Sequence, residues 1–167
     1  MKKTLFFIGI TLFFSGTVFP HGINIFQIFL LENRIPIIID FDTESIYISD
    51  SIEKQELGKL INLFILRINV IESNIINHRT TRTSNGKPFR RQIVTVVDGK
   101  VRIIDDLRTE VKLIYDPTHP DAIPNGARKG YVEYPNIDFI TELVDLIATV
   151  RYFELLIKAG IEKELIN

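Results

Sequence analysis

The longest uninterrupted helical pattern in the chain covers residues 136–167. Asn136 or Asp138 can cap its start, and Pro135 precedes it, so we expect a helix over 136–165. The pattern contains two apolar stripes. One stripe is spaced by three and four residues at Ile140, Leu143, Ile147, Val150, Ile157 and Ile161, and the other lies beside it at Phe139, Leu146, Phe153 and Leu156. We expect the first stripe to pack within the chain and the second to contact other molecules.

Residues 51–77 carry a second helical pattern. Ser49, Asp50 or Ser51 can cap it, and Glu53 falls in its first turn. Its apolar positions alternate by three and four over about three heptads, the spacing of a coiled-coil seam. They are Leu57, Ile61, Phe64, Ile68, Ile71 and Ile75. We therefore predict that the two long helices pair as an antiparallel coiled coil.

The residues between the helices, 78–135, predict a loop and a small β region. Residues 78–91, HRTTRTSNGKPFRR, hold five cationic side chains and no acidic ones, which indicates an exposed basic loop. The runs QIVTVV and KVRIID flank Asp98-Gly99, a pair typical of hairpin turns. EVKLIY and Tyr131 to Tyr134 predict two more short strands. The fold class is therefore α+β and mainly helical.

The front of the chain looks like an export signal followed by an extension. Two lysines precede the apolar run LFFIGITLFF, and small residues follow it before Pro20, the layout of a secretory signal peptide. We expect residues 1–20 to be a removed signal, with a retained anchor or a buried segment as alternatives. Residues 21–50 would form an N-terminal extension with two apolar runs, INIFQIFLL and IPIIIDFD. Membrane contact is expected only through residues 1–20 if they are uncleaved.

The sequence offers little for catalysis or metal binding. Cysteine is absent, and no glycine-rich phosphate loop or paired-histidine motif occurs. Asp116, His119 and Asp121 could in principle hold a metal, but Pro117 and Pro120 favour a rigid turn in which Asp caps its own backbone. A cation site at Asp40, Asp42 and Glu44 is likewise less favoured than a solvated strand edge. We expect no enzyme activity, no cofactor and no metal.

The basic loop could bind phosphate groups through Arg79, Arg82, Arg90 and Arg91. Only Phe89 is available there to stack on a base, and an exported protein rarely meets nucleic acid. Contact with acidic protein surfaces is the better interpretation, so no nucleic-acid partner is expected.

Three segments, taken in order, resemble the flagellar basal-body rod protein FlgC family. Residues 66–91, LRINVIESNIINHRTTRTSNGKPFRR, are similar to its LRxDVIxxNIANANTTRTxxGGPYRR pattern. Residues 115–122, YDPTHPDA, resemble its YDPxHPDA turn, and residues 130–154 resemble its GYVxxPNVxxxxEMVxMIxASRxYE signature. The family pattern has Asn-Ala-Asn where this chain has Asn77-His78-Arg79, and it starts near residue 49.

The resemblance implies a structural subunit of the rod that links the flagellar motor to the hook. Its partners would be copies of itself and other rod proteins, and its location the bacterial periplasm and basal body. Residues 51–167 would form the rod-type domain. The expected interface residues are Asn74, Asn77, Thr81, Arg82, Arg90, Arg91, Phe139, Leu146, Arg151, Phe153 and Leu156. The alternative is an exported periplasmic paralogue that acts as a flagellar accessory or adaptor, in which residues 21–50 bind another partner or cover the helices.

Overall fold

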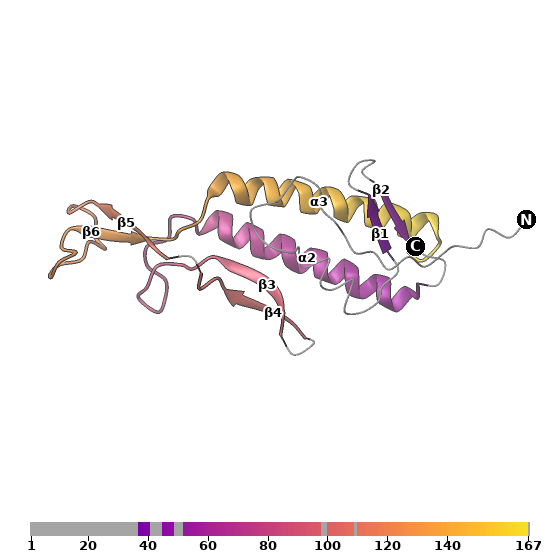
Figure 1. Ribbon diagram of the computed structural model, residues 1–167, viewed down its shortest axis with the longest axis horizontal. Helices are drawn as coiled ribbons and strands as arrows, with labels where there is room; N and C mark the ends of the chain where they lie inside the picture. The colour runs from indigo at the N-terminus through magenta and orange to yellow at the C-terminus, as the bar shows by residue number, and fades with distance from the viewer. Residues whose placement is uncertain (1–36, 41–44, 49–51, 98–99, 109, 167) are drawn as a thin grey trace, which may run out of the picture.

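Two long helices lie side by side in the computed structural model, which describes residues 37–40, 45–48, 52–97, 100–108 and 110–166. Figure 1 shows α2 (Lys54–Ile76) between α3 (Phe139–Glu162) on one side and the β3–β4 hairpin on the other. The helices are antiparallel, because Leu57 near the start of α2 lies by Gly160 near the end of α3, while Asn74 bonds to Glu142 at the other end. The predicted α+β class is confirmed.

Helix α2 begins later than the sequence predicted. Glu53 is its N-cap, and a reciprocal capping box links Glu53 with Glu56 at the third helical position. The expectation that Glu53 lies inside the first turn was therefore wrong. In this box the Glu53 amide donates to Glu56 Oε2 over 3.4 Å. The helix ends at Ile76, and Asn77 caps it by donating to the Ser73 carbonyl.

Helix α3 starts at Phe139, three residues later than predicted, with the predicted cap Asp138, and it ends earlier than predicted. Asp138 caps it by accepting a hydrogen bond of 2.8 Å from the Thr141 amide, and this bond lowers the pKa of Asp138. The helix stops at Glu162 rather than at residue 165. Glu164 has a φ of 58°, in the left-handed region where α-helices commonly terminate.

The described residues also form three two-stranded antiparallel sheets. Strand β1 (Ile37–Asp40) pairs with β2 (Ser45–Ile48), β3 (Gln92–Val97) with β4 (Lys100–Asp105), and β5 (Lys112–Tyr115) with β6 (Tyr131–Tyr134). The register pairs Val97 with Lys100, so the predicted hairpin is confirmed, although its turn residues lie outside the described ones. The signal-like residues 1–20 and most of the extension 21–50 also lie outside them.

The core lies at the α2–α3 contact and continues onto the β3–β4 hairpin. Leu57, Leu60, Leu63 and Phe64 of α2 pack with Leu156 of α3. Val94 of β3 and Val101 of β4 pack against the same cluster. The β5–β6 hairpin extends beyond the ends of the helices, as Figure 1 shows. No helix in the described part of the chain is long and apolar enough to cross a membrane.

Candidate subunit-assembly surface

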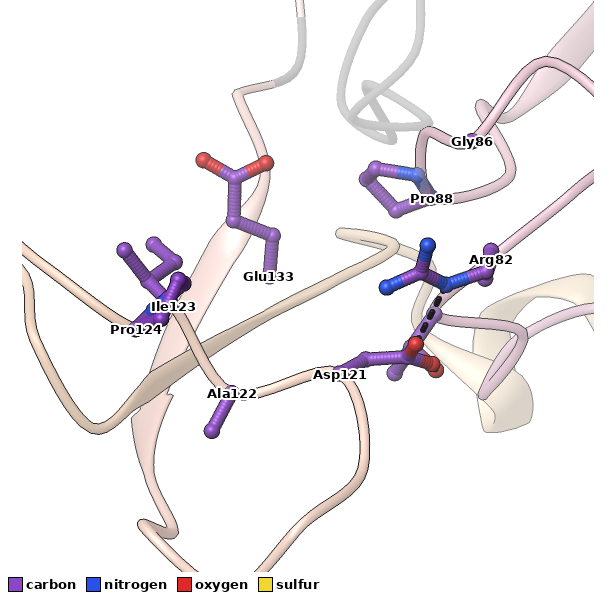
Figure 2. A pocket seen from close by; sticks show the side chains of 9 residues that line it. Arg82, Gly86, Pro88, Asp121, Ala122, Ile123, Pro124 and Glu133 are labelled. Carbon is purple, nitrogen blue, oxygen red and sulfur yellow. Dashed lines mark hydrogen bonds and ion pairs between the residues drawn. The ribbon is translucent and has the colours of Figure 1, made fainter.

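The basic loop after α2 is tied to the loop between β5 and β6. Thr81 Oγ1 donates a hydrogen bond of 2.7 Å to Asp121, and Arg82 Nε donates to the other oxygen of the same carboxylate. The hydrogen bonds from Thr81 and then Arg82 lower the pKa of Asp121. Figure 2 shows this pair at one side of an open pocket of about 210 Å³ that also contains Pro88, Ala122 and Glu133. The contact fixes the basic loop, which was expected to face partners, against the loop between β5 and β6.

The segment around His119 is a hydrogen-bonded turn. Asp116 Oδ1 accepts from both the amide and the hydroxyl of Thr118, and His119 Nδ1 accepts from the Asp121 amide. The rigid-turn interpretation is therefore confirmed. Within the residues that the structure describes, no three histidine, aspartate or glutamate side chains gather to form a metal site. The second candidate cation site includes Asp42 and Glu44, which lie outside the described residues.

Asn74 joins α2 to both α3 and β3. Its side-chain amide donates hydrogen bonds of 2.9 Å to Glu142 Oε2 and to the Gln92 carbonyl, and its Oδ1 accepts 2.8 Å from the Gln92 amide. The side chain thus pairs with the Gln92 backbone much as a neighbouring strand would. Because Asn74 is buried, these three bonds satisfy groups that would otherwise be costly to bury. Its predicted place on an outer surface is wrong.

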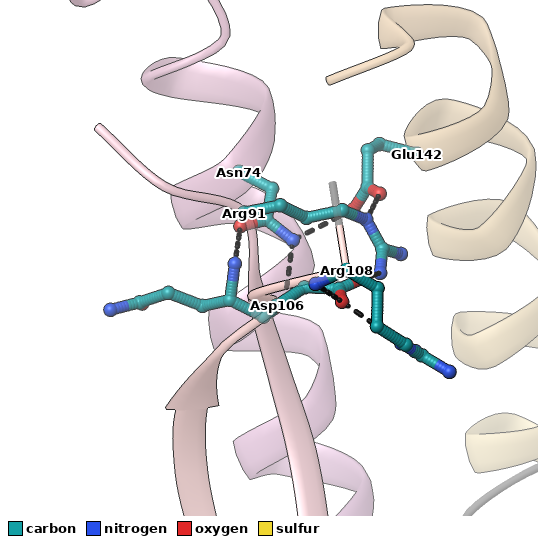
Figure 3. Close-up of polar contacts among 6 residues, drawn as sticks. Asn74, Arg91, Asp106, Arg108 and Glu142 are labelled. Carbon is teal, nitrogen blue, oxygen red and sulfur yellow. Dashed lines mark hydrogen bonds and ion pairs between the residues drawn. The ribbon is translucent and has the colours of Figure 1, made fainter. Parts of the chain in front are cut away.

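Arg91 extends this network to the residues after β4. Figure 3 shows its guanidinium between Glu142 and Asp106, with Nε–Oε1 and Nη1–Oδ2 distances of 2.6 and 3.5 Å. Asp106 also binds Arg108, whose Nε lies 3.1 Å from Oδ1. Burial alone would raise the pKa of Asp106. The hydrogen bonds and charge of Arg108, together with the charge of Arg91, outweigh burial and lower that pKa.

A second polar contact crosses the helices two turns further along α3. Arg67 Nε donates a hydrogen bond of 3.2 Å to Thr149 Oγ1, and Thr149 donates to the Asp145 carbonyl. Desolvation lowers the pKa of Arg67, while the nearby carboxylate of Asp145 opposes that shift. The inward face of α3 is therefore partly polar.

The roles predicted for the two stripes of α3 were wrong at Leu156 and Phe153 of one stripe and at Ile140 and Ile147 of the other. Leu156 of the supposed outer stripe is fully buried in the core, and Phe153 packs on Phe64 with ring centroids 6.1 Å apart. Ile140 and Ile147 of the supposed inner stripe are each 64% exposed. The buried positions on α3 are Glu142, Thr149, Leu156 and Gly160. Because hydrogen bonds satisfy Glu142 and Thr149, polar residues occupy the inward face, and a pattern of apolar residues alone could not identify it.

Some of the other predicted interface residues make contacts within the chain, and others are exposed on its surface. Phe139 is exposed and stacks on His78, with ring centroids 5.1 Å apart. Arg151 is exposed on α3, and its Nη1 lies 3.7 Å from Glu154 Oε2. Leu146 and Arg90 are half-buried. Four exposed apolar residues had been predicted to face the interior: Ile140, Leu143, Ile147 and Ile161. Val144, which lies beside them on α3, is also exposed. The seven-residue spacing of Glu142, Thr149 and Leu156 was the signal that could have revealed the inward face.

Asp106 makes stability sensitive to acid. Because its folded pKa lies below the ordinary value of 3.8, its stabilisation is fully present above 3.8 and is lost as the pH falls through the lower, folded pKa. We expect the urea midpoint to fall between about pH 5 and pH 2, and to fall less steeply in the Asp106→Asn variant. Equal slopes in the wild-type protein and the variant would contradict the assignment.

The comparisons with known proteins agree on one family. The chain is 38% identical over 112 residues to the flagellar basal-body rod protein FlgC of Borreliella burgdorferi, a match that covers 53% of this chain and 74% of that protein. It is 35% identical over 105 residues to the FlgC protein of Aquifex aeolicus, covering 56% and 74%. The FlgC protein of Bacillus subtilis is 33% identical over 115 residues, covering 53% and 74%. No family model matches the chain. At this identity and coverage, the chain belongs to the flagellar basal-body rod protein FlgC family.

Proposed function

We propose that this protein is a structural subunit of the bacterial flagellar basal-body rod. The observation that carries the proposal is the 38% identity to a basal-body rod protein, of which the chain covers 74%. Nothing in the comparisons favours the alternative of a periplasmic accessory protein. A rod subunit acts by packing against its neighbours, so the role requires no catalytic turnover. Its partners would be copies of itself and other rod proteins.

Within the subunit, we propose that α2 and α3 form an antiparallel coiled coil. The four buried α3 positions, Glu142, Thr149, Leu156 and Gly160, follow separations of seven, seven and four residues, and the half-buried Phe153 lies between Thr149 and Leu156 on the same side. Such separations keep one side of a helix against its partner. The polar pairs Asn74–Glu142 and Arg67–Thr149 would then fix the register between the helices, since a shift would leave buried polar groups without partners.

The proposed assembly surface is the exposed apolar side of α3 near its start. Ile140, Leu143, Val144 and Ile147 form a continuous side of the helix that neither α2 nor a described strand buries. Covering one such side chain contributes about 1.5 to 3 kcal/mol, so repeated contacts could hold subunits together without a covalent link. This surface would be extended by Phe139, Arg151 and the basic loop of residues 78–91, which contains Arg82. Asn74 and Leu156 support it from inside.

Replacing Ile147 with Lys is expected to abolish swimming while leaving the isolated subunit folded. The residue is exposed in the subunit, so the lysine is solvated there, but it would be buried without a partner in the assembled rod. The measurements are swimming on soft agar and recovery of the subunit in purified basal bodies, with equal protein levels verified by immunoblot. Leu107→Lys is the matched control, because Leu107 is also exposed but belongs to the segment after β4 and not to α3. Normal rods with Ile147→Lys would place the interface elsewhere.

Mass spectrometry of purified basal bodies and of the soluble periplasmic fraction tests the function itself. We expect peptides from residues 51–167, the proposed rod-type domain, in the basal bodies. The N-terminal peptide would show whether residues 1–20 are removed as a signal and whether the extension 21–50 is retained. Recovery of the chain only in the soluble fraction would contradict the rod proposal and support an accessory protein.

A further inference from the structure

The C-terminal half of α3 carries an apolar groove, separate from the proposed assembly surface. Its apolar lining is Phe153, Ile157 and Ile161, four residues apart, and Glu154, Lys158 and Glu162 also line it. Its described lining residues all lie along one side of α3, so the groove, of about 570 Å³, is open to solvent along its length. Ile161 is 54% exposed, so the described residues leave this groove open.

The N-terminal extension reaches the same half of α3. Strand β2 contacts α3, and Figure 1 shows the β1–β2 hairpin against the C-terminal part of that helix. Strand β1 begins at Ile37, and only residues 32–36 separate it from the apolar run INIFQIFLL at residues 23–31. Such a link can span roughly 20 Å when extended. The run is therefore tethered within reach of the groove.

Residues 23–31 are so apolar that we expect them to be buried against another surface. Seven of its nine residues are apolar and none is charged. Left in water, such a run would expose a contiguous apolar surface, and nine residues are too few to span a membrane. The groove and the run therefore match in chemistry.

We propose that residues 23–31 of the same chain occupy the groove formed by Phe153, Ile157 and Ile161. The β1–β2 hairpin holds the run close to its site, so the contact is intramolecular and needs no high protein concentration. The extension thereby covers the C-terminal half of α3 and leaves Ile140, Val144 and Ile147 available. This docking does not depend on the rod function, and it can be tested in the purified subunit.

Cysteine labelling gives a direct test because the chain has no cysteine of its own. Ile161→Cys places a thiol in the groove, and Ile140→Cys places one at a similarly exposed position outside it. Each variant is compared in a protein that retains residues 23–31, verified by mass, and in one that lacks them. We expect deletion to accelerate maleimide labelling of Ile161→Cys several-fold and to leave Ile140→Cys unchanged. Unchanged labelling at Ile161→Cys, or equal acceleration at both positions, would overturn the proposal.

A disulfide test identifies the occupant. Phe29→Cys is combined with Ile161→Cys in one chain, and with Ile140→Cys in the control, after circular dichroism shows that helix content is retained. Under mild oxidation we expect the first pair to form a disulfide within the monomer and the control pair to remain reduced. A disulfide-linked dimer would identify a second copy as the occupant. That result, or failure of the first pair to form any disulfide, would overturn the proposal.

Discussion

Replacing Glu142 with leucine is expected to lower the free energy of unfolding by about 3 to 5 kcal/mol. Glu142 is buried and accepts hydrogen bonds from Asn74 and Arg91, which come from separate segments of the chain. Without the carboxylate, the Arg91 guanidinium keeps only its longer contact to Asp106, and one Asn74 bond is lost. The measurement is urea unfolding followed by circular dichroism at neutral pH.

Two further variants distinguish the effect of leaving Arg91 without its partner from the effect of removing a carboxylate from α3. Glu154→Leu removes an exposed carboxylate from the same helix, and its effect should stay within about 1 kcal/mol. Adding Arg91→Met to Glu142→Leu removes the stranded charge, so the double variant should be more stable than Glu142→Leu alone. If the double variant loses the sum of the two single effects, Glu142 and Arg91 do not stabilise the fold as a pair.

Leu156→Ala is expected to cost about 2 to 5 kcal/mol of unfolding free energy. Leu156 is fully buried among Leu57, Leu60 and Phe64, so the truncation leaves a cavity between the helices. Ile147→Ala on the opposite side of α3 should change subunit stability by less than about 0.5 kcal/mol, because Ile147 is largely exposed. Denaturant unfolding of the two variants under the same conditions is the measurement.

This comparison also tests which side of α3 faces α2. Both substitutions shorten an aliphatic side chain to alanine in the same helix, so helix propensity contributes little to their difference. A larger loss for Ile147→Ala than for Leu156→Ala would reverse the orientation and restore the stripe that the sequence pattern favoured.

The candidate site was only partly predictable, and the reason is visible at Arg82 and Arg91. Both arginines were expected at an interface because the basic loop lacks acidic residues. Their partners are Asp121 and Glu142, 39 and 51 residues further along the chain. A local charge pattern does not contain such pairs, since only folding brings distant segments into contact. Arg82 remains at the surface beside its partner, while Arg91 becomes part of the buried network.

Local sequence patterns were sufficient to predict the two helices, the strands over Gln92–Val97, Lys100–Asp105 and Tyr131–Tyr134, and the cap at Asp138. These features depend on interactions between residues close in the chain. The side of α3 that is buried depends instead on contacts between distant segments. That choice depends on whether Glu142 and Thr149 find partners on α2 and before β3. A buried polar side chain is acceptable only when such partners are present, and their presence is a property of the whole fold.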